Sequence, residues 1–401
     1  MRSEARALDL DRLRAETPGV RHRTHLNNAG AALMPAPVLD AMTGYLEREA
    51  TIGGYETAAE QSERLDGVYD SIARLIGGQR EEVALLENAT VAWQMAFYAL
   101  AADLRPGDRI LTTRAEYAAN YVAYLQTAKR SGVVIDVIPD DADGVLDPAA
   151  LAAMLDERVR LIAITWIPTN GGLVNPAAEV GRIARAAGIP YLLDACQALG
   201  QMPVDVEALG CDLLSATGRK FLRGPRGTGI LYVRKALLER LEPAMLDHFA
   251  APWMAPDRYR PRADARRFET WENSYAARLG LGVAADYALA LGLDLIQARC
   301  LALADRLRER LGELPGVRLH DLGPRPCAIV SFSLAGTQAE EVKARCAAAG
   351  VNVSTSHPAS TLLDATARDL PTVVRASPHY YNTEEELERL LAIVWDLGRG
   401  E

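Results

Sequence analysis

The chain has 401 residues, of which 49% are hydrophobic and 24% charged, a composition typical of a globular protein and not of a disordered or fibrous one. A single hydrophobic core stops growing at roughly 250–300 residues, so a chain of this length is expected to divide into two domains. The 53 acidic residues outnumber the 44 basic ones and give a net charge of −9. This balance argues against nucleic acid or an anionic membrane as the main partner.

Five cysteines are scattered along the chain without a C-x-x-C pair: Cys196, Cys211, Cys300, Cys327 and Cys346. An odd set of this kind predicts reduced thiols, and neither a disulfide framework nor a structural zinc site. The sequence opens without an apolar signal segment and contains no run of 18 apolar residues. A cytoplasmic protein without a bound metal is therefore expected.

Short apolar runs alternate with longer segments of helical period from about Val83 onward. This alternation predicts an α/β protein with a mostly parallel sheet. The expected strands are Val83–Leu86, Arg109–Thr112, Val134–Ile138, Leu161–Trp166, Tyr191–Asp194, Leu213–Ala216 and Gly229–Val233. The helices expected between them include Val91–Leu100, Tyr117–Ser131, Asp147–Leu155 and Ala177–Ala187.

The last third of the chain predicts a smaller α+β unit. Before it, Pro252–Arg267 lacks helical period and is expected to form a long loop, and Tyr275–Arg310 is expected to form one long helix. The unit itself is expected to contain strands near Val317–Leu319, Ala328–Leu334 and Val373–Ala376, and helices over Gln338–Ala349 and Glu384–Leu397. These patterns place a large domain at residues 26–280 and a small one at residues 1–25 and 281–401.

Polar residues follow two of the expected strands. A helix that starts near Thr90 would present free backbone N–H groups suited to a phosphate, although a capping threonine is the simpler interpretation. Asp194 ends an apolar strand, where α/β folds place ligand groups. A helix N-cap would explain this aspartate equally well.

Lysine is rare, because arginine supplies 40 of the 44 basic residues. Lys129, Lys235 and Lys343 have simple surface explanations, whereas Lys220 lies in a Gly-rich turn between two expected buried strands. It follows Asp194 by 220 − 194 = 26 residues. A pyridoxal phosphate (PLP) enzyme requires this pair, since the lysine forms a Schiff base with the aldehyde and the aspartate keeps the pyridine nitrogen protonated.

Three motifs resemble those of class V aminotransferase-fold, fold-type I PLP-dependent enzymes. They are Asp194-Ala-Cys-Gln197, Ser215-Ala-Thr-Gly-Arg-Lys220 with the Gly-rich segment 224–229 behind it, and Arg375-Ala-Ser-Pro-His379 with the Tyr-Tyr-Asn-Thr that follows. The resemblance extends from Leu26 to the last helix. It implies the fold-type I transferase architecture, an α/β fold in which a large PLP-binding domain with a mostly parallel seven-stranded sheet is joined to a smaller α+β domain. It also implies an amino-acid substrate and a homodimer with shared active sites.

The resemblance implies a role for each matching residue near the cofactor. Lys220 would hold PLP and then take the α-proton, Asp194 would pair with the pyridine nitrogen, and Gln197 would bond to the phenolic oxygen. Tyr117 would stack on the ring, where relatives often have a histidine. The residues implied at the phosphate are Ala89, Thr90, Thr217 and Arg219, with Asn273 or Tyr275 reaching it from the neighbouring subunit.

Arg375 matches the arginine that binds the substrate carboxylate, although a surface arginine is the alternative. Asn28, Thr169 and Asn170 are further candidates for substrate binding. Tyr55 lies in a segment expected to form a loop at the mouth of the site, and it is a candidate proton donor or subunit contact. His357 is a candidate for proton transfer or an ordinary loop residue.

The reaction class depends on a missing cysteine. Cysteine desulfurases need a nucleophilic cysteine on the loop before the final strand, and Ala359 occupies its expected place here. The segments 52–60, 168–176 and 375–379 are more similar to the C–S lyase and isopenicillin N epimerase-like branch.

We therefore expect a carbon–sulfur lyase that performs α,β-elimination on an S-substituted cysteine or its sulfoxide, releasing a thiol or sulfenate, pyruvate and ammonia. An epimerase, a transaminase or an oxidative or decarboxylating enzyme is the alternative. A cysteine desulfurase is the less favoured one.

Overall fold

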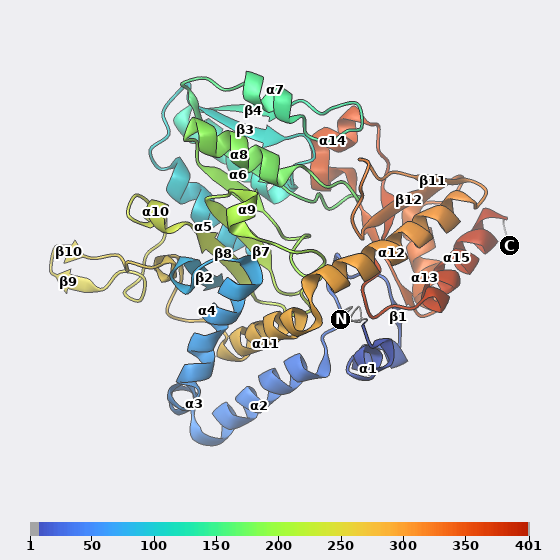
Figure 1. Cartoon of the computed structure of the whole chain (residues 1–401), viewed down its shortest axis with the longest axis horizontal. Coiled ribbons are helices and arrows are strands. Elements are labelled where there is room, and N and C mark those ends of the chain that lie inside the picture. The colour runs from blue at the N-terminus through green and yellow to red at the C-terminus, as the bar shows by residue number, and fades with distance from the viewer. Residues whose placement is uncertain (1–7, 400–401) are drawn as a thin grey trace, which may run out of the picture.

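The computed structural model describes residues 8–399. Its strands form one sheet of seven, one of four and two short pairs (Figure 1). The helices are α1 (Leu10–Ala15), α2 (Ala36–Ile52), α3 (Gly54–Glu60), α4 (Ser62–Ile76), α5 (Ala89–Ala101), α6 (Ala118–Ser131), α7 (Pro148–Ala153), α8 (Ala177–Ala187), α9 (Val206–Leu209), α10 (Lys235–Leu238), α11 (Tyr275–Leu291), α12 (Leu293–Gly312), α13 (Ala339–Ala348), α14 (Leu362–Ala367) and α15 (Glu384–Gly398).

The seven strands of the central sheet are β2 (Val83–Leu86), β3 (Arg109–Thr113), β4 (Val134–Ile138), β5 (Val159–Thr165), β6 (Tyr191–Asp194), β7 (Leu213–Thr217) and β8 (Gly229–Val233). Their order is β2-β8-β7-β6-β5-β3-β4, and β8 is antiparallel to its neighbours while the other neighbouring pairs are parallel. The mostly parallel α/β fold predicted from the sequence is confirmed. Each predicted strand agrees with the observed one to within two residues.

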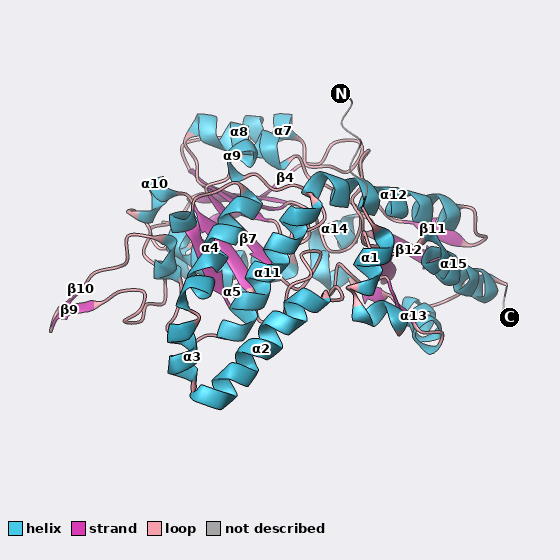
Figure 2. Ribbon diagram, turned by 60° about the horizontal axis from the view of Figure 1, so that its bottom comes forward, coloured by secondary structure: helices cyan, strands magenta, loops and turns pink. Residues whose placement is uncertain are grey.

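Helices cover both faces of the central sheet (Figure 2). Leu193 packs into the core shared with α4, α8 and α11, whereas its neighbour Leu192 packs on the opposite face with Trp93 of α5 and Tyr124 of α6. Successive strand side chains point to opposite faces, so a strand covered on both sides must be apolar throughout. This is why short continuous apolar runs predicted these strands well.

A second sheet, which is antiparallel, lies in the C-terminal part, where the sequence predicts a smaller α+β unit. Its strands, in spatial order, are β11 (Val317–Leu319), β12 (Val330–Leu334), β15 (Val373–Ala376) and β14 (Ser354–Ser356), and α12 and α13 pack against them. Near this sheet, β1 (Thr24–His25) pairs in parallel with β13 (Val351–Asn352), so the chain segment before α2 lies beside the C-terminal part. The other described strands are β9 (Trp253–Ala255) and β10 (Arg258–Tyr259).

The predicted long helix over Tyr275–Arg310 is wrong, because the chain turns between α11 and α12. Gly292 has a φ of 96°, which side-chain-bearing residues rarely adopt, and the two helices meet at 82°. In the part of the chain that the structure describes, no single helix is long and apolar enough to span a membrane, and only this bent pair, taken together, reaches the required length and composition.

The expected domain boundary after residue 280 falls inside α11, which packs against α2 and α4. The expected small domain also includes residues 1–7, which lie outside the described residues. The division into residues 26–280 and 281–401 therefore stays a prediction, and Gly292 is the nearest break in the chain.

Two loops predicted from the sequence contain regular structure. Within Pro252–Arg267, β9 and β10 form an antiparallel hairpin that projects away from the C-terminal part (Figure 1). The segment expected as a loop at the mouth of the site is helix α3, set off from α2 by Gly53 with a φ of 104°. Tyr55 on α3 has 78% of its surface exposed.

Candidate active site

A cavity of about 380 Å³ opens at the carboxyl ends of β5, β6 and β7 and at the start of α5. Ligands of α/β sheets bind at this edge of the strands. Eight of the predicted cofactor-site residues line this cavity: Ala89, Thr90, Tyr117, Asp194, Gln197, Thr217, Arg219 and Lys220. Thr169, predicted at the substrate, lines it too.

Lys220 follows β7 in a tightly packed turn. A Cβ on Gly218 would lie 2.4 Å from the Thr228 hydroxyl, so only glycine fits there. The turn is anchored by the buried Arg223, which donates to the Leu33 carbonyl at 2.8 Å. Burial lowers the pKa of Lys220, and an amine with a lowered pKa is a better nucleophile and base near neutral pH.

Asp194 ends β6 and is buried. Its Oδ1 accepts from the backbone N–H of Cys196 at 2.9 Å, and its Oδ2 accepts from Nδ2 of Asn120 at 3.0 Å. No helix begins at Asp194, so the alternative of a helix N-cap is wrong. The Asp194 carboxylate accepts from two neutral donors, and its oxygens can each accept further hydrogen bonds from the cavity side. Such a buried carboxylate can pair with a protonated ring nitrogen.

The start of α5 forms one wall of the cavity. Asn88 is the N-cap, and its side chain accepts from the backbone N–H of Val91 at 2.9 Å, so a capping role for Thr90 is wrong. The first backbone N–H groups of this helix remain for a phosphate, with the positive end of the helix dipole behind them. A Cβ on Gly229 would lie 2.4 Å from the backbone of Asn88, so glycine permits the close approach of β8.

Arg375 on β15 is 7% exposed, so the alternative of a surface arginine is wrong. It donates to the backbone carbonyl and the hydroxyl of Thr169 at 3.0 and 2.6 Å, and its buried Nε has no partner. Burial lowers the pKa of Arg375 to about 10, and the nearby Arg219 acts in the same direction. A carboxylate ligand would stabilise this buried, positively charged guanidinium, because it supplies the missing hydrogen-bond acceptor and a negative charge.

Gln197, Tyr117 and Arg219 complete the walls. Gln197 is buried, donates to the Ala29 carbonyl at 3.2 Å and has an Oε1 without a partner. Tyr117 is the residue before α6 and is partly exposed, and burial of its hydroxyl raises its pKa. Arg219 donates to the Gly30 carbonyl, and burial lowers its pKa.

Arg375 reaches the cavity wall through its bond to Thr169, and the other four predicted substrate residues lie outside that wall. Tyr55 is exposed on α3, and His357 is exposed beside Thr372, with its ring nitrogen 3.2 Å from that hydroxyl. Asn28 is fully buried and donates to the Ser377 carbonyl at 2.7 Å, so its side chain joins two chain segments. Their roles toward a substrate stay predictions.

Asn170, the fourth, is buried next to Thr169 but faces away from the cavity lining. Its side chain bonds at 2.5 Å to the hydroxyls of Thr361 and Ser356. These contacts connect β14 and the 3-10 helix Pro358–Thr361 to the segment that follows β5. Asn170 therefore supports the position of Thr169, which itself contacts Arg375.

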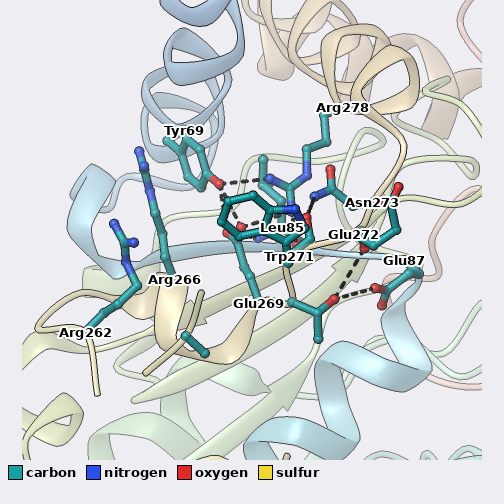
Figure 3. A network of polar contacts seen from close by, with 12 residues as sticks. Tyr69, Leu85, Glu87, Arg262, Arg266, Glu269, Trp271, Glu272, Asn273 and Arg278 are labelled. Carbon is teal, nitrogen blue, oxygen red and sulfur yellow. Dashed lines mark hydrogen bonds and ion pairs between the residues drawn. The ribbon is translucent and has the colours of Figure 1, made fainter. Parts of the chain in front are cut away.

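Asn273 and Tyr275 line a separate cavity of about 180 Å³. Beside it, the buried Glu269 accepts from the Tyr69 hydroxyl at 2.9 Å and pairs with Arg278 at 3.0 Å (Figure 3). Asn273 donates to the Trp271 carbonyl, and its Oδ1 has no partner. Within one subunit these two residues do not join the Lys220 cavity, so their role across a subunit contact stays a prediction.

No role was predicted from the sequence for five lining residues: Asn88, Asn120, Thr165, Ile167 and Cys196. Glu116, which lies behind them, was quoted in a motif but given no role. The spacing of Glu116 and Asn120 was a usable signal, because residues four apart at the start of a helix share one face. Cys196 follows Asp194 by two residues and could have been placed beside it.

A sequence model of the Aminotransferase class-V family matches residues 24–390. The chain belongs to this family. A probable cysteine desulfurase from Xylella fastidiosa (strain 9a5c) is 32% identical over 395 residues, covering 96% of this chain and 94% of the relative. The apo structure of a cysteine desulfurase from Thermococcus onnurineus NA1 superposes with a TM-score of 0.92 at 25% identity, and each chain is covered completely.

A further solved structure is that of a C-DES mutant with glycine covalently linked to its PLP cofactor. It has a TM-score of 0.85 and 22% identity and covers 96% of this chain and 99% of its own. The class-V family is a family of PLP-dependent enzymes, and the predictions of a fold-type I PLP enzyme and of PLP as cofactor are confirmed.

The predicted reaction is contradicted. Relatives from several organisms carry the name cysteine desulfurase, which we had ranked below an α,β-eliminating lyase. The ranking depended on the missing cysteine near Ala359. Without a cysteine near Ala359, the loop before the final strand offers no thiol to accept the sulfur. The C–S bond can still be cleaved if another thiol accepts it.

The residues of the cavity fit PLP. The start of α5 suits its phosphate, Asp194 suits its ring nitrogen and the Lys220 amine suits its aldehyde. Two buried polar atoms in this region, Gln197 Oε1 and Arg375 Nε, lack partners in the described residues. Buried polar groups are nearly always hydrogen-bonded, so these atoms fit a site that a polar ligand completes.

Proposed function

We propose that the protein is a cysteine desulfurase that breaks the Cβ–S bond of cysteine and passes the sulfur to a thiol. In the balanced reaction, cysteine and the thiol give alanine and a persulfide, so no further oxidant or reductant is needed. The observation that carries the proposal is the buried Arg375, whose Nε has no partner and whose guanidinium bonds to Thr169 at the wall of the cavity that holds Lys220. The name shared by relatives about as long as this chain supports the choice of cysteine.

Each side chain has a defined task in this reaction. Arg375 binds the substrate carboxylate, and Thr169 holds the guanidinium in place. Lys220 takes the proton from the substrate α-carbon and returns it, which its lowered pKa favours. Asp194 holds a proton at the ring nitrogen of the cofactor, and PLP, when bound, withdraws electrons from the α-carbon.

The acceptor thiol comes from outside the chain. Burial raises the pKa of Cys211, Cys300 and Cys327 to about 12 and that of Cys346 to about 11. Cys196 lines the cavity, but burial and the neighbouring Asp194 raise the pKa of its thiol as well. A thiol in this state is a poor nucleophile, because the thiolate is the attacking species.

The proposed assembly is a homodimer in which Asn273 or Tyr275 reaches the partner's phosphate. Asn273 has an unpartnered side-chain oxygen, and apolar side chains lie exposed on the neighbouring hairpin, with Trp253 74% exposed. Exposed apolar clusters of this kind mark contact surfaces.

The proposal is tested by product analysis of purified PLP-loaded protein supplied with cysteine and dithiothreitol. We expect alanine and sulfide in equal amounts, because dithiothreitol first takes the sulfur as a persulfide and then releases it as sulfide. Without dithiothreitol, alanine formation should fall strongly, because the only acceptor thiol left in the solution is that of cysteine itself. Formation of pyruvate in place of alanine would contradict the proposal.

A further inference from the structure

A second buried carboxyl lies behind Asp194. Glu116, in the turn between β3 and α6, is 3% exposed. Its four donors are the Thr112 hydroxyl, the Asn120 side-chain amide and the Tyr117 backbone N–H, each at 2.9 Å, and the Thr165 hydroxyl at a shorter distance. All four donors are neutral. None of the ion pairs formed by the described residues includes Glu116, which is unusual for a buried glutamate.

Asn120 connects this carboxyl to Asp194. Its Nδ2 donates to Glu116 Oε1 at 2.9 Å and to Asp194 Oδ2 at 3.0 Å. A side-chain amide nitrogen has two hydrogens, so one nitrogen bridges two carboxyl groups and uses both. The bridge is buried, and buried charges interact strongly because little water screens them.

The surroundings of Glu116 leave its charge uncompensated. Burial raises the pKa of Glu116 to about 7, and the charge of Asp194 acts in the same direction. Among the described residues, the other titratable group that faces it is the hydroxyl of Tyr124 on α6, whose pKa is raised by burial and by Glu116. The residues that β3 and β5 contribute, Thr112 and Thr165, are neutral. The charge of Glu116 therefore changes near neutral pH, one amide away from Asp194.

We propose that Glu116 is a positioning residue that acts through Asn120 on Asp194, so that its ionised form strengthens the hold of Asp194 on the protonated ring nitrogen of PLP. An ionised Glu116 opposes a second negative charge at Asp194 and favours the positive charge that the ring nitrogen brings. Cofactor affinity then rises as Glu116 ionises. The inference rests on the proposed pairing of Asp194 with the ring nitrogen.

The test measures the dissociation constant of PLP between about pH 5.5 and pH 8.5, a range that brackets the ordinary titration of a group with a pKa near 7. Glu116→Gln keeps the shape of the side chain but cannot ionise. Glu82→Gln is the matched control, because Glu82 is also buried, accepts from the backbone N–H groups of Gln79 and Lys235, and is not among the residues that line the cavity.

We expect the ratio of the Glu116→Gln constant to the wild-type constant to be near one at the lower pH, where both side chains are neutral. It should rise to about tenfold at the higher pH, which corresponds to a coupling of about one pK unit between the two carboxyls. The Glu82→Gln ratio should stay near one throughout. A Glu116→Gln ratio that does not change with pH would overturn the inference.

Two further variants separate the possible failures. Asp194→Asn should weaken PLP binding at every pH, and if it does not, the proposed pairing of Asp194 fails and not only the role of Glu116. Thr112→Val removes one hydrogen bond from Glu116 with little change of shape. Because the lost hydrogen bond favours the ionised carboxylate, the increase in PLP affinity should occur at a higher pH in Thr112→Val than in the wild type. If it occurs at the same pH in both proteins, the inference is contradicted, even where Glu116→Gln does not fold.

Discussion

Three cationic side chains lie near one another at or beside the Lys220 cavity, and Asp194 is the acidic residue among those that line it. Burial lowers the pKa of Lys220, Arg219 and Arg375, and the positive charges near one another add to the effect. A site in this state favours anionic ligands, because each anion relieves both the desolvation and the repulsion. The phosphate of PLP and the carboxylate of an amino acid supply such anions.

Arg375 is the residue whose change should affect substrate affinity most directly. Arg375→Gln removes the bidentate donor, and losing one partner of a buried charged pair costs about 2–5 kcal/mol. We therefore expect KM for cysteine to rise about 30-fold or more, while the dissociation constant of PLP changes little. Steady-state kinetics and a cofactor titration on the same preparation measure both quantities.

Arg64→Gln, on the exposed face of α4, is the control and should leave KM unchanged. If Arg375→Gln lowers kcat while KM stays at the wild-type value, Arg375 does not bind the substrate carboxylate in the way proposed.

At the scale of elements, the start of α5 depends on a close approach of β8. Gly229→Ala would put a Cβ 2.4 Å from the Asn88 backbone, so the helix start must shift. We expect a loss of about 1–3 kcal/mol in the free energy of unfolding, as in other overpacked sites. PLP binding should weaken too, because the shifted N–H groups no longer suit the phosphate. Thermal unfolding and a cofactor titration check the two effects.

Gly44→Ala is the matched control, because a Cβ at this exposed position of α2 would meet nothing within 4 Å. It should raise helix stability by about 0.5–1 kcal/mol. If Gly229→Ala is as harmless as Gly44→Ala, the close approach of β8 does not hold the start of α5 in place.

Helices and strands could be predicted where their own residues carry the pattern that defines them. The apolar runs of β2 to β8 are buried on both faces, so each strand could be read from its own residues. The break at Gly292, which has a φ of 96°, could not be predicted, because a glycine inside a helical pattern is usually tolerated. Helix α3 was missed because its polar sequence carries no strong period.

At the scale of the whole molecule, the site depends on segments that are far apart in the sequence. Arg375 comes from the C-terminal sheet and Lys220 follows β7 of the central one, and Thr169, which bonds to Arg375, lines the same cavity as Lys220. The sequence motifs predicted these residues through their resemblance to a family. The contacts of Asn28 with Ser377, and the exposure of Tyr55, could not be predicted, because they depend on which distant segments pack together.

The proposed dimer can be tested by mixing two inactive variants. If Asn273 serves the partner's site, hybrid dimers of Lys220→Ala and Asn273→Leu contain one site with both residues intact. After dissociation and reassociation in equal amounts, about a quarter of wild-type activity should return, since half of the dimers are hybrids and each regains one of two sites. Mixing each variant with itself is the control, and no recovery in the hybrid would contradict a shared site.

The central claim is that Lys220 carries the cofactor, and reduction with borohydride followed by peptide mass mapping tests it most directly. The chain has four lysines, so the four candidate peptides are easily distinguished. We predict that the reduced PLP adduct appears on the peptide that contains Lys220 and is absent from those with Lys129, Lys235 and Lys343. An adduct on another lysine, with Lys220 unmodified, would contradict the account.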